Sequence, residues 1–154
     1  MKRKVSEIIG FRCKASEMLY MLDTNIISYF AEGNKNVISN LENCVFSGND
    51  IGISVVAYYE IERGLKYVNA SRKLKDFYQF ASQCKIIPIS LETAKLASEI
   101  HSGLRRIGKL IEDADIFIGA SALENNAILV TNNKEHLGRI AGLTLENWTL
   151  ALDT

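Results

Sequence analysis

Blocks of apolar residues along this chain end in short polar turns, and each turn leads into residues with helical spacing. The first block covers residues 19–22, four bulky uncharged residues that are followed at once by Asp23, Thr24 and Asn25. Apolar residues between 26 and 30 then recur with the period of a helix rather than that of a strand. The pattern therefore predicts a buried strand, a polar turn and a helix.

The same pattern recurs along the rest of the chain. It predicts further strands over 51–54, 85–87, 127–130 and 143–148, and helices over 36–46, 55–68, 72–84, 91–107 and 111–122. Strands that alternate with helices are typical of a parallel sheet. We therefore expect an α/β fold built on a parallel sheet.

Composition indicates one ordinary globular domain. The chain has 154 residues, of which 47% are hydrophobic and 23% are charged, which suits a single core. No apolar run has the length of a membrane span or of a signal peptide, so we expect a cytoplasmic protein with no membrane contact. We interpret residues 1–17 as a basic N-terminal extension of uncertain order and residues 18–154 as the domain.

The charge balance excludes a strong general attraction to nucleic acid. Lys plus Arg and Asp plus Glu number 18 each, so any binding of a polyanion has to be local. Basic residues gather over 63–75 and over 105–109. Such clusters are either solvated helix faces or phosphate contacts, and the sequence leaves both interpretations open.

Polar side chains follow several predicted strands at the point where each strand ends. Asp23 and Ser54 end the first two, and Thr131 and Asn133 follow the strand over 127–130. In a parallel sheet the residues beyond the carboxyl ends of the strands line the crevice in which ligands bind. Asp23 is therefore a candidate site residue, although an Asp at this place also caps helices.

Glu60 lies near the start of the helix that follows the second strand. It shares a helix face with Val56, Gly64 and Tyr67, which we interpret as an inward face. A carboxylate on such a face needs a partner, because burying it alone is costly. Either a metal ion or Arg63, one turn further along the helix, would supply that partner.

Asp115 lies in the first turn of the last long predicted helix. Its face continues through Gly119 and Ala122, which are small enough for close packing and direct Asp115 toward the edge of the core. Glu112 and Asp113 stand at the start of the same helix, and we expect one of them to cap it.

The three acids Asp23, Glu60 and Asp115 would repel one another in one crevice unless a cation lay among them. Oxygen ligands without His or Cys favour Mg²⁺ or Mn²⁺ over zinc. Such ions commonly serve the attack of water on a phosphodiester. His101 and His136 are not expected beside a strand-end aspartate, so the sequence does not predict acid/base chemistry by a histidine pair.

Five runs within residues 19–150 carry a family resemblance in their order and spacing. They are Met21-Leu22-Asp23-Thr24-Asn25, Glu60-Ile61 with Gly64, Asp115-Ile116 with Gly119-Ala120, Val130-Thr131-Asn132-Asn133, and Glu146-Asn147-Trp148. Together they resemble the PIN-domain ribonucleases, and among these the VapC-type toxins of toxin–antitoxin pairs.

The resemblance implies a PIN-like three-layer α/β/α fold with a central parallel sheet. It implies an endoribonuclease that uses Mg²⁺, with Mn²⁺ as a substitute, acts on RNA as a homodimer and is inhibited by a cognate antitoxin. Asp23 and Asp115 match the metal-binding aspartates, and Glu60 matches the third catalytic acid. The supporting residues are Thr24, Asn25, Ser54, Thr131 and Asn133. Some PIN domains carry a fourth acid where Asn133 stands, and the resemblance leaves open whether Glu135 supplies it here.

Two other functions remain open at this point. One is a PIN nuclease that processes RNA without an antitoxin. The other is a receiver-like or phosphatase-like domain in which Asp23 accepts a phosphoryl group. Such acceptor sites need a second acid close to the first, and Asn25 occupies that place here.

Overall fold

Five parallel strands form the sheet that the alternating blocks predict, in a computed structural model that describes residues 18–152. The strands are β1 (Leu19–Leu22), β2 (Asp50–Ser54), β3 (Lys85–Ile87), β4 (Ile128–Val130) and β5 (Thr144–Glu146). Their order across the sheet is β3-β2-β1-β4-β5, so β1 is central. The expected parallel α/β fold is confirmed, whereas the extension expected over residues 1–17 lies outside the described residues.

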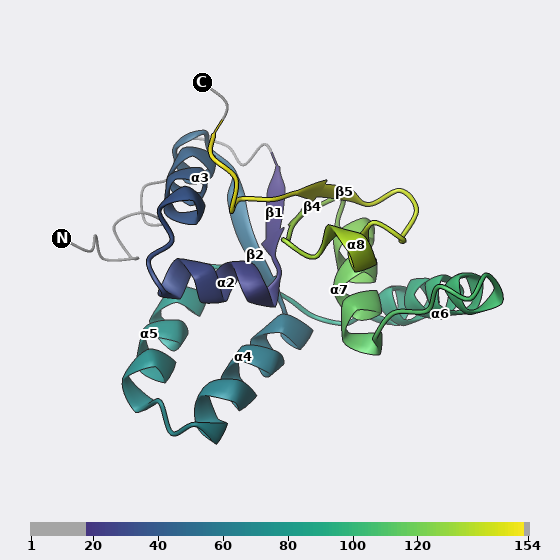
Figure 1. Cartoon of the computed structure of the whole chain (residues 1–154), viewed down its shortest axis with the longest axis horizontal. Helices are drawn as coiled ribbons and strands as arrows, with labels where there is room; N and C mark the ends of the chain where they lie inside the picture. Colours follow the sequence, from purple (N-terminus) through teal and green to yellow (C-terminus); the bar gives the residue numbers. More distant parts are fainter. Residues whose placement is uncertain (1–17, 153–154) are drawn as a thin grey trace.

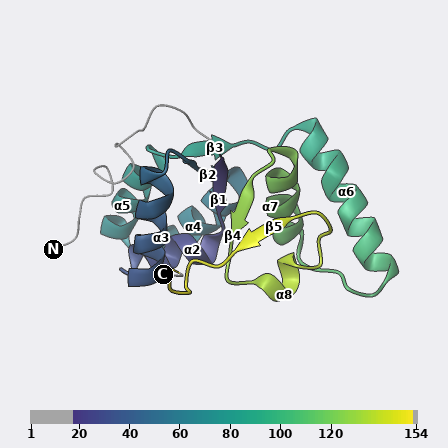
Figure 2. The same cartoon turned by 90° about the horizontal axis from the view of Figure 1, so that it is seen from above.

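The described helices flank this sheet on two sides. They are α2 (Thr24–Ala31), α3 (Lys35–Phe46), α4 (Val55–Tyr67), α5 (Ser71–Ala81), α6 (Leu91–Arg106), α7 (Asp113–Glu124) and α8 (Lys134–Leu137). In both views α3 and α5 lie to one side of β1, while α6 and α7 lie to the other (Figures 1 and 2). The arrangement is the expected three-layer α/β/α fold. Within residues 18–152 no helix has the length and apolar character needed to cross a bilayer.

The start of α4 is fixed by a buried cap. Ser54 is the last residue of β2 and is 1% exposed, and its hydroxyl accepts a hydrogen bond of 3.1 Å from the backbone N–H of Ala57. This bond satisfies one of the free N–H groups of the first helical turn. The cap therefore ties the direction of α4 to the end of a central strand.

The face of α7 that carries Gly119 and Ala122 is closely packed, as predicted. A Cβ atom at Gly119 would lie 2.4 Å from Cδ1 of Ile140, a buried residue that follows α8. Ala122 has no exposed surface at all. The contact fixes α7, and therefore Asp115 in its first turn, against the segment that follows α8.

Two of the predicted details are wrong. The face of α4 that was interpreted as inward is largely outward, because Gly64 is exposed and Tyr67 is 88% exposed, and the buried residue of this helix is Ala57. The helix α8 was not predicted, because its four residues are too few for a periodic signal. Both differences affect the site, since α4 and α8 each carry one of its residues.

The close approach at Gly119 predicts opposite outcomes for two glycine substitutions. Gly119→Ala should destabilise the protein by about 1–3 kcal/mol through overpacking against Ile140. The control Gly103→Ala in α6 meets no atom within 4 Å and should stabilise the protein by about 0.5–1 kcal/mol through helix propensity. Urea unfolding measures both, and adding Ile140→Val should restore part of the loss. Equal gains at the two glycines would contradict the packing.

Candidate active site

Asp23 follows β1 directly and lies beneath the surface, with 4% of its area exposed. Its carboxylate accepts hydrogen bonds from the backbone N–H of Thr24 at 2.8 Å, from Oγ1 of Thr131 at 2.8 Å and from Nδ2 of Asn25 at 3.4 Å. Asp23 is also the N-cap residue of α2. The two interpretations that the sequence offered, helix cap and site residue, therefore apply to the same side chain.

Thr131 reaches Asp23 because their strands are neighbours. The pairing of β1 with β4 sets Leu22 opposite Val130, the last residue of each strand. Asp23 follows Leu22 and Thr131 follows Val130, so these two residues also lie side by side. Thr131 is fully buried, and its hydroxyl donates to Asp23 and accepts from the backbone N–H of Asn133 at 3.0 Å. Thr131 thus holds the carboxylate in place from behind rather than contacting a ligand.

Glu60 is linked to the same strand end through Thr24. The Thr24 hydroxyl donates to Oε1 of Glu60 at 3.0 Å, which joins α2 to α4. The proposed structural partner Arg63 instead lies over the ring of Tyr59, with its guanidinium carbon 5.1 Å from the ring centroid. Glu60 therefore faces the strand ends, as a ligand-binding acid would.

These side chains surround a cleft of about 400 Å³. It is lined by Asp23, Thr24, Asn25, Glu60, Glu112, Asp115, Asn133 and His136. Of the predicted site residues, six line the cleft, while Thr131 lies behind Asp23 and Ser54 caps α4. The site is therefore the crevice at the carboxyl ends of β1 and β4.

Glu112 and His136 belong to the cleft, although the sequence did not assign them to it. Glu112 stands at the N-cap position of α7, but its side chain makes no capping hydrogen bond, so the cap prediction is wrong for its carboxylate. Nδ1 of His136 lies 3.8 Å from Oδ2 of Asp115 and 3.4 Å from Nδ2 of Asn133. His136 therefore lies beside Asp115, an acid of a helix rather than of a strand end.

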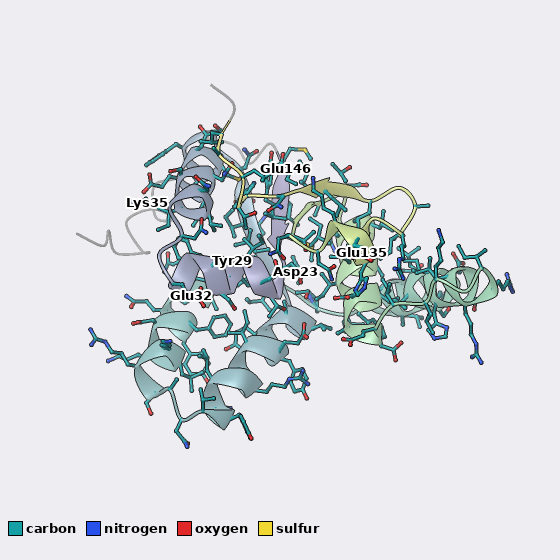
Figure 3. All side chains as sticks on the ribbon, viewed as in Figure 1. Asp23, Tyr29, Glu32, Lys35, Glu135 and Glu146 are labelled. Atoms are coloured by element: carbon teal, nitrogen blue, oxygen red, sulfur yellow. The ribbon has the colours of Figure 1, made fainter. Side chains whose placement is uncertain are left out.

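Glu135 is not among the residues that line the cleft, which answers the question that the sequence left open about this acid. It stands on α8, next in sequence to His136, and its side chain is 84% exposed, with Oε1 3.9 Å from the guanidinium of Arg139 (Figure 3). The fourth acid of the cleft is thus Glu112 rather than an acid after β4.

Burial and neighbouring acids raise the pKa of Asp115. Partial burial is the main cause that raises the pKa of Asp115 to about 6, followed by the charges of Asp23, Glu112 and Glu60, while His136 lowers it. Burial also raises the pKa of Asp23, against its hydrogen bonds from Thr131, Thr24 and Asn25. The cleft therefore holds more negative charge than its own groups compensate.

The donor set fits a hard divalent cation. Carboxylate and amide oxygens dominate the lining, and their mutual repulsion is what a bound cation would relieve. Among residues 18–152, however, no three His, Cys, Asp or Glu side chains are already grouped tightly enough to hold a metal ion. Binding would require the side chains of α4 and α7 to turn toward Asp23, which its hydrogen bonds already hold in place.

The raised pKa of Asp115 predicts a stability effect with a definite sign. Its folded pKa of about 6 exceeds the ordinary 3.8, so the folded state binds more protons and loses stability as pH rises between these values. Asp115→Asn should therefore stabilise the metal-free protein at neutral pH by on the order of 1 kcal/mol, raising the unfolding midpoint by about 2–4 °C.

The gain from Asp115→Asn should disappear below the ordinary carboxyl pKa, where both states are protonated. Calorimetry in EDTA across the pH range measures it, with Glu135→Gln as the exposed control that should change the midpoint little at any pH. A gain at acid pH that equals the gain at neutral pH would contradict the electrostatic cause.

Comparison with known proteins identifies the family of the chain. Residues 20–143 match the model of the PIN domain family. The chain is 33% identical to Ribonuclease VapC2 of Rickettsia felis, over 85% of this chain and 98% of the relative. It is 27% identical to the tRNA(fMet)-specific endonuclease VapC of Shigella flexneri, over 84% of this chain and 98% of the relative.

Solved structures give the same result. The chain resembles VapBC2 of Rickettsia felis, solved bound to a DNA fragment from its promoter, with a TM-score of 0.79 and 32% identity over 85% of this chain and 99% of that one. It resembles VapBC-1 of nontypeable Haemophilus influenzae with a TM-score of 0.78 and 25% identity, over 86% and 100%. The chain belongs to the PIN-domain family, within its group of VapC ribonucleases.

Proposed function

We propose that this chain is a cytoplasmic endoribonuclease toxin that hydrolyses RNA at the cleft beyond β1 and β4. The observation that carries the proposal is the convergence of four carboxylates on one cleft, where burial and mutual repulsion raise the pKa of Asp115 to about 6. Such a cluster costs stability in its charged form, and a bound cation would relieve that cost. The proposed cation is Mg²⁺, with Mn²⁺ as a substitute, because oxygen ligands dominate the cleft.

Asp23 and Asp115 are the proposed ligands of that cation. Asp23 supports this role because its three hydrogen bonds hold it in place, so that it supplies a preorganised oxygen. When bound, the cation would polarise the attacked phosphate and lower the pKa of a water molecule. The buried position of Asp23 argues against the alternative of a phosphoryl acceptor, since only 4% of the residue's area is exposed.

Glu60 is proposed to orient the attacking water. Its carboxylate lies across the cleft from Asp115, and the Thr24 hydroxyl holds it at one oxygen, which leaves the other to accept a proton from water. Oxygen from that water forms a bond to phosphorus, the bond to the ribose 3′ oxygen breaks, and the 3′ oxygen leaves with a proton. The products carry a 5′ phosphate and a 3′ hydroxyl.

A cognate antitoxin and a second copy of the chain are the proposed protein partners. The structural relatives are complexes with an antitoxin, and their shared fold supports the same arrangement here. A folded toxin whose cleft is open to water needs such an inhibitor.

Cleavage should depend on Asp115 and on the metal, but not on the neighbouring exposed acid. Purified protein is incubated with total cellular RNA and Mg²⁺, Mn²⁺ or EDTA, and the new ends are sequenced. We expect discrete cuts with 5′ phosphates that vanish in EDTA. Asp115→Asn and Asp23→Ala should lower the rate more than about a hundredfold, which corresponds to ~2.7 kcal/mol. The matched control Glu135→Gln should cut like the wild type, and undiminished cutting by Asp115→Asn would refute the proposal.

Expression in cells distinguishes a toxin from a PIN nuclease that processes RNA. The wild-type chain should arrest growth when expressed alone and should be tolerated together with a small DNA-binding protein encoded beside it. Asp115→Asn should be tolerated in either case. Growth that continues with active wild-type enzyme and no such partner would favour the RNA-processing alternative.

A further inference from the structure

Tyr59 and Arg63 form an exposed pair on α4 beside the cleft. They stand one helical turn apart, and the guanidinium carbon of Arg63 lies 5.1 Å from the centroid of the Tyr59 ring. Tyr59 is 58% exposed, which is high for a tyrosine that lies next to a cleft residue. A cation held over an exposed ring leaves aromatic and guanidinium surface open to solvent, where a ligand can reach it.

The pair stands on α4 next to Glu60, which lines the cleft, and we call this place the rim, although the pair itself is not among the lining residues. Tyr59 precedes Glu60 in sequence, and Arg63 lies one turn further along the same helix. Contact with Tyr59 is the main cause that raises the pKa of Arg63, and the charges of Glu60 and Glu112 raise it further. Arg63 therefore carries a full positive charge within reach of two cleft acids.

An RNA strand needs a contact of this kind because the cleft itself repels phosphate. Four acids line the cleft, and the chain as a whole has no net charge to attract a polyanion. Single-stranded RNA is commonly held by stacking its bases on aromatic rings and on guanidinium planes, with cations on the adjacent phosphates. The Tyr59–Arg63 pair presents a ring, a guanidinium plane and a positive charge at one place.

We propose that the Tyr59–Arg63 pair binds single-stranded RNA, stacking a base next to the scissile phosphate while the guanidinium contacts a neighbouring phosphate. This inference rests on the proposed ribonuclease function and adds the residues that seat the substrate. Because both side chains and Glu60 belong to one helix, the stacked base and the attacked phosphate have a fixed spacing.

Tyr67 provides a matched control for Tyr59. It is also an exposed tyrosine of α4, with 88% of its area accessible, but it stands at the last residue of the helix and away from Glu60. A general loss of exposed aromatic surface would affect the two positions alike. Only a stacking site at the rim distinguishes them.

The test measures binding of a short, fluorescein-labelled single-stranded RNA of mixed sequence by anisotropy. All variants carry Asp115→Asn and are measured with Mg²⁺, so that the RNA stays intact. Tyr59→Leu should weaken binding roughly tenfold, and Tyr59→Phe, which keeps the ring, should bind nearly as the parent does. Tyr67→Leu should bind like the parent.

Arg63→Gln should weaken binding and lower the slope of log affinity against log salt by about 1, whereas Arg72→Gln on α5 should change neither the affinity nor the slope.

Equal affinities for Tyr59→Leu and Tyr67→Leu, with unchanged unfolding midpoints, would overturn the proposal. So would a Tyr59→Leu variant that binds RNA normally but no longer retains the antitoxin, because the surface would then bind protein.

The same variants in the active enzyme separate the stacking proposal from the ribonuclease proposal. If the wild type cuts RNA and Tyr59→Leu cuts equally well, the ribonuclease function stands and the stacking site does not. If RNA binding depends on Tyr59 but the wild type cuts nothing, the nuclease function fails instead.

Discussion

The pairing of β1 with β4 is the contact on which the cleft depends. These strands are far apart in sequence, yet their parallel register places Thr131 directly beside Asp23, where its hydroxyl donates to the carboxylate. Without that donor, a carboxylate buried to 4% exposure would be under-solvated and would tend to take up a proton. The sheet therefore decides where Asp23 lies, and it also supplies a hydrogen bond that favours the charged carboxylate against the burial that raises its pKa.

The cleft is built at the expense of stability. Asp115 is ionised at neutral pH against three neighbouring acids, and the free energy that this repulsion removes must come from contacts elsewhere. The close packing of Gly119 against Ile140 and the cap that Ser54 places on α4 are such contacts, and both hold the helices that carry the acids. Because these contacts hold α4 and α7 in place, the acids on the two helices stay close together even without a bound cation.

Sequence reasoning found the parts of the site that follow a strong local pattern. Asp23 and Thr131 end buried strands, and Asp115 heads a helix of small residues, so each had a signal in its neighbours. Glu112 and His136 had none, because one resembles a helix cap and the other lies on a helix of four residues. The face of α4 was misassigned because Gly64 and Tyr67 fit an apolar stripe by spacing alone, while their exposure depends on which elements pack nearby.

An acidic cleft cannot both hold a cation and attract a polyanion by its own charge, so recognition and chemistry have to be separated in space. In this chain α4 joins them. Its capped first turn stands on the end of β2, Glu60 faces the cleft, and Tyr59 with Arg63 faces outward one step around the same helix. A helix is stiff over two turns. An RNA strand bound to the Tyr59–Arg63 pair, as proposed, would therefore keep a constant position relative to Glu60. A loop would not preserve that geometry, which is why a rim residue on α4 can influence which phosphate is attacked.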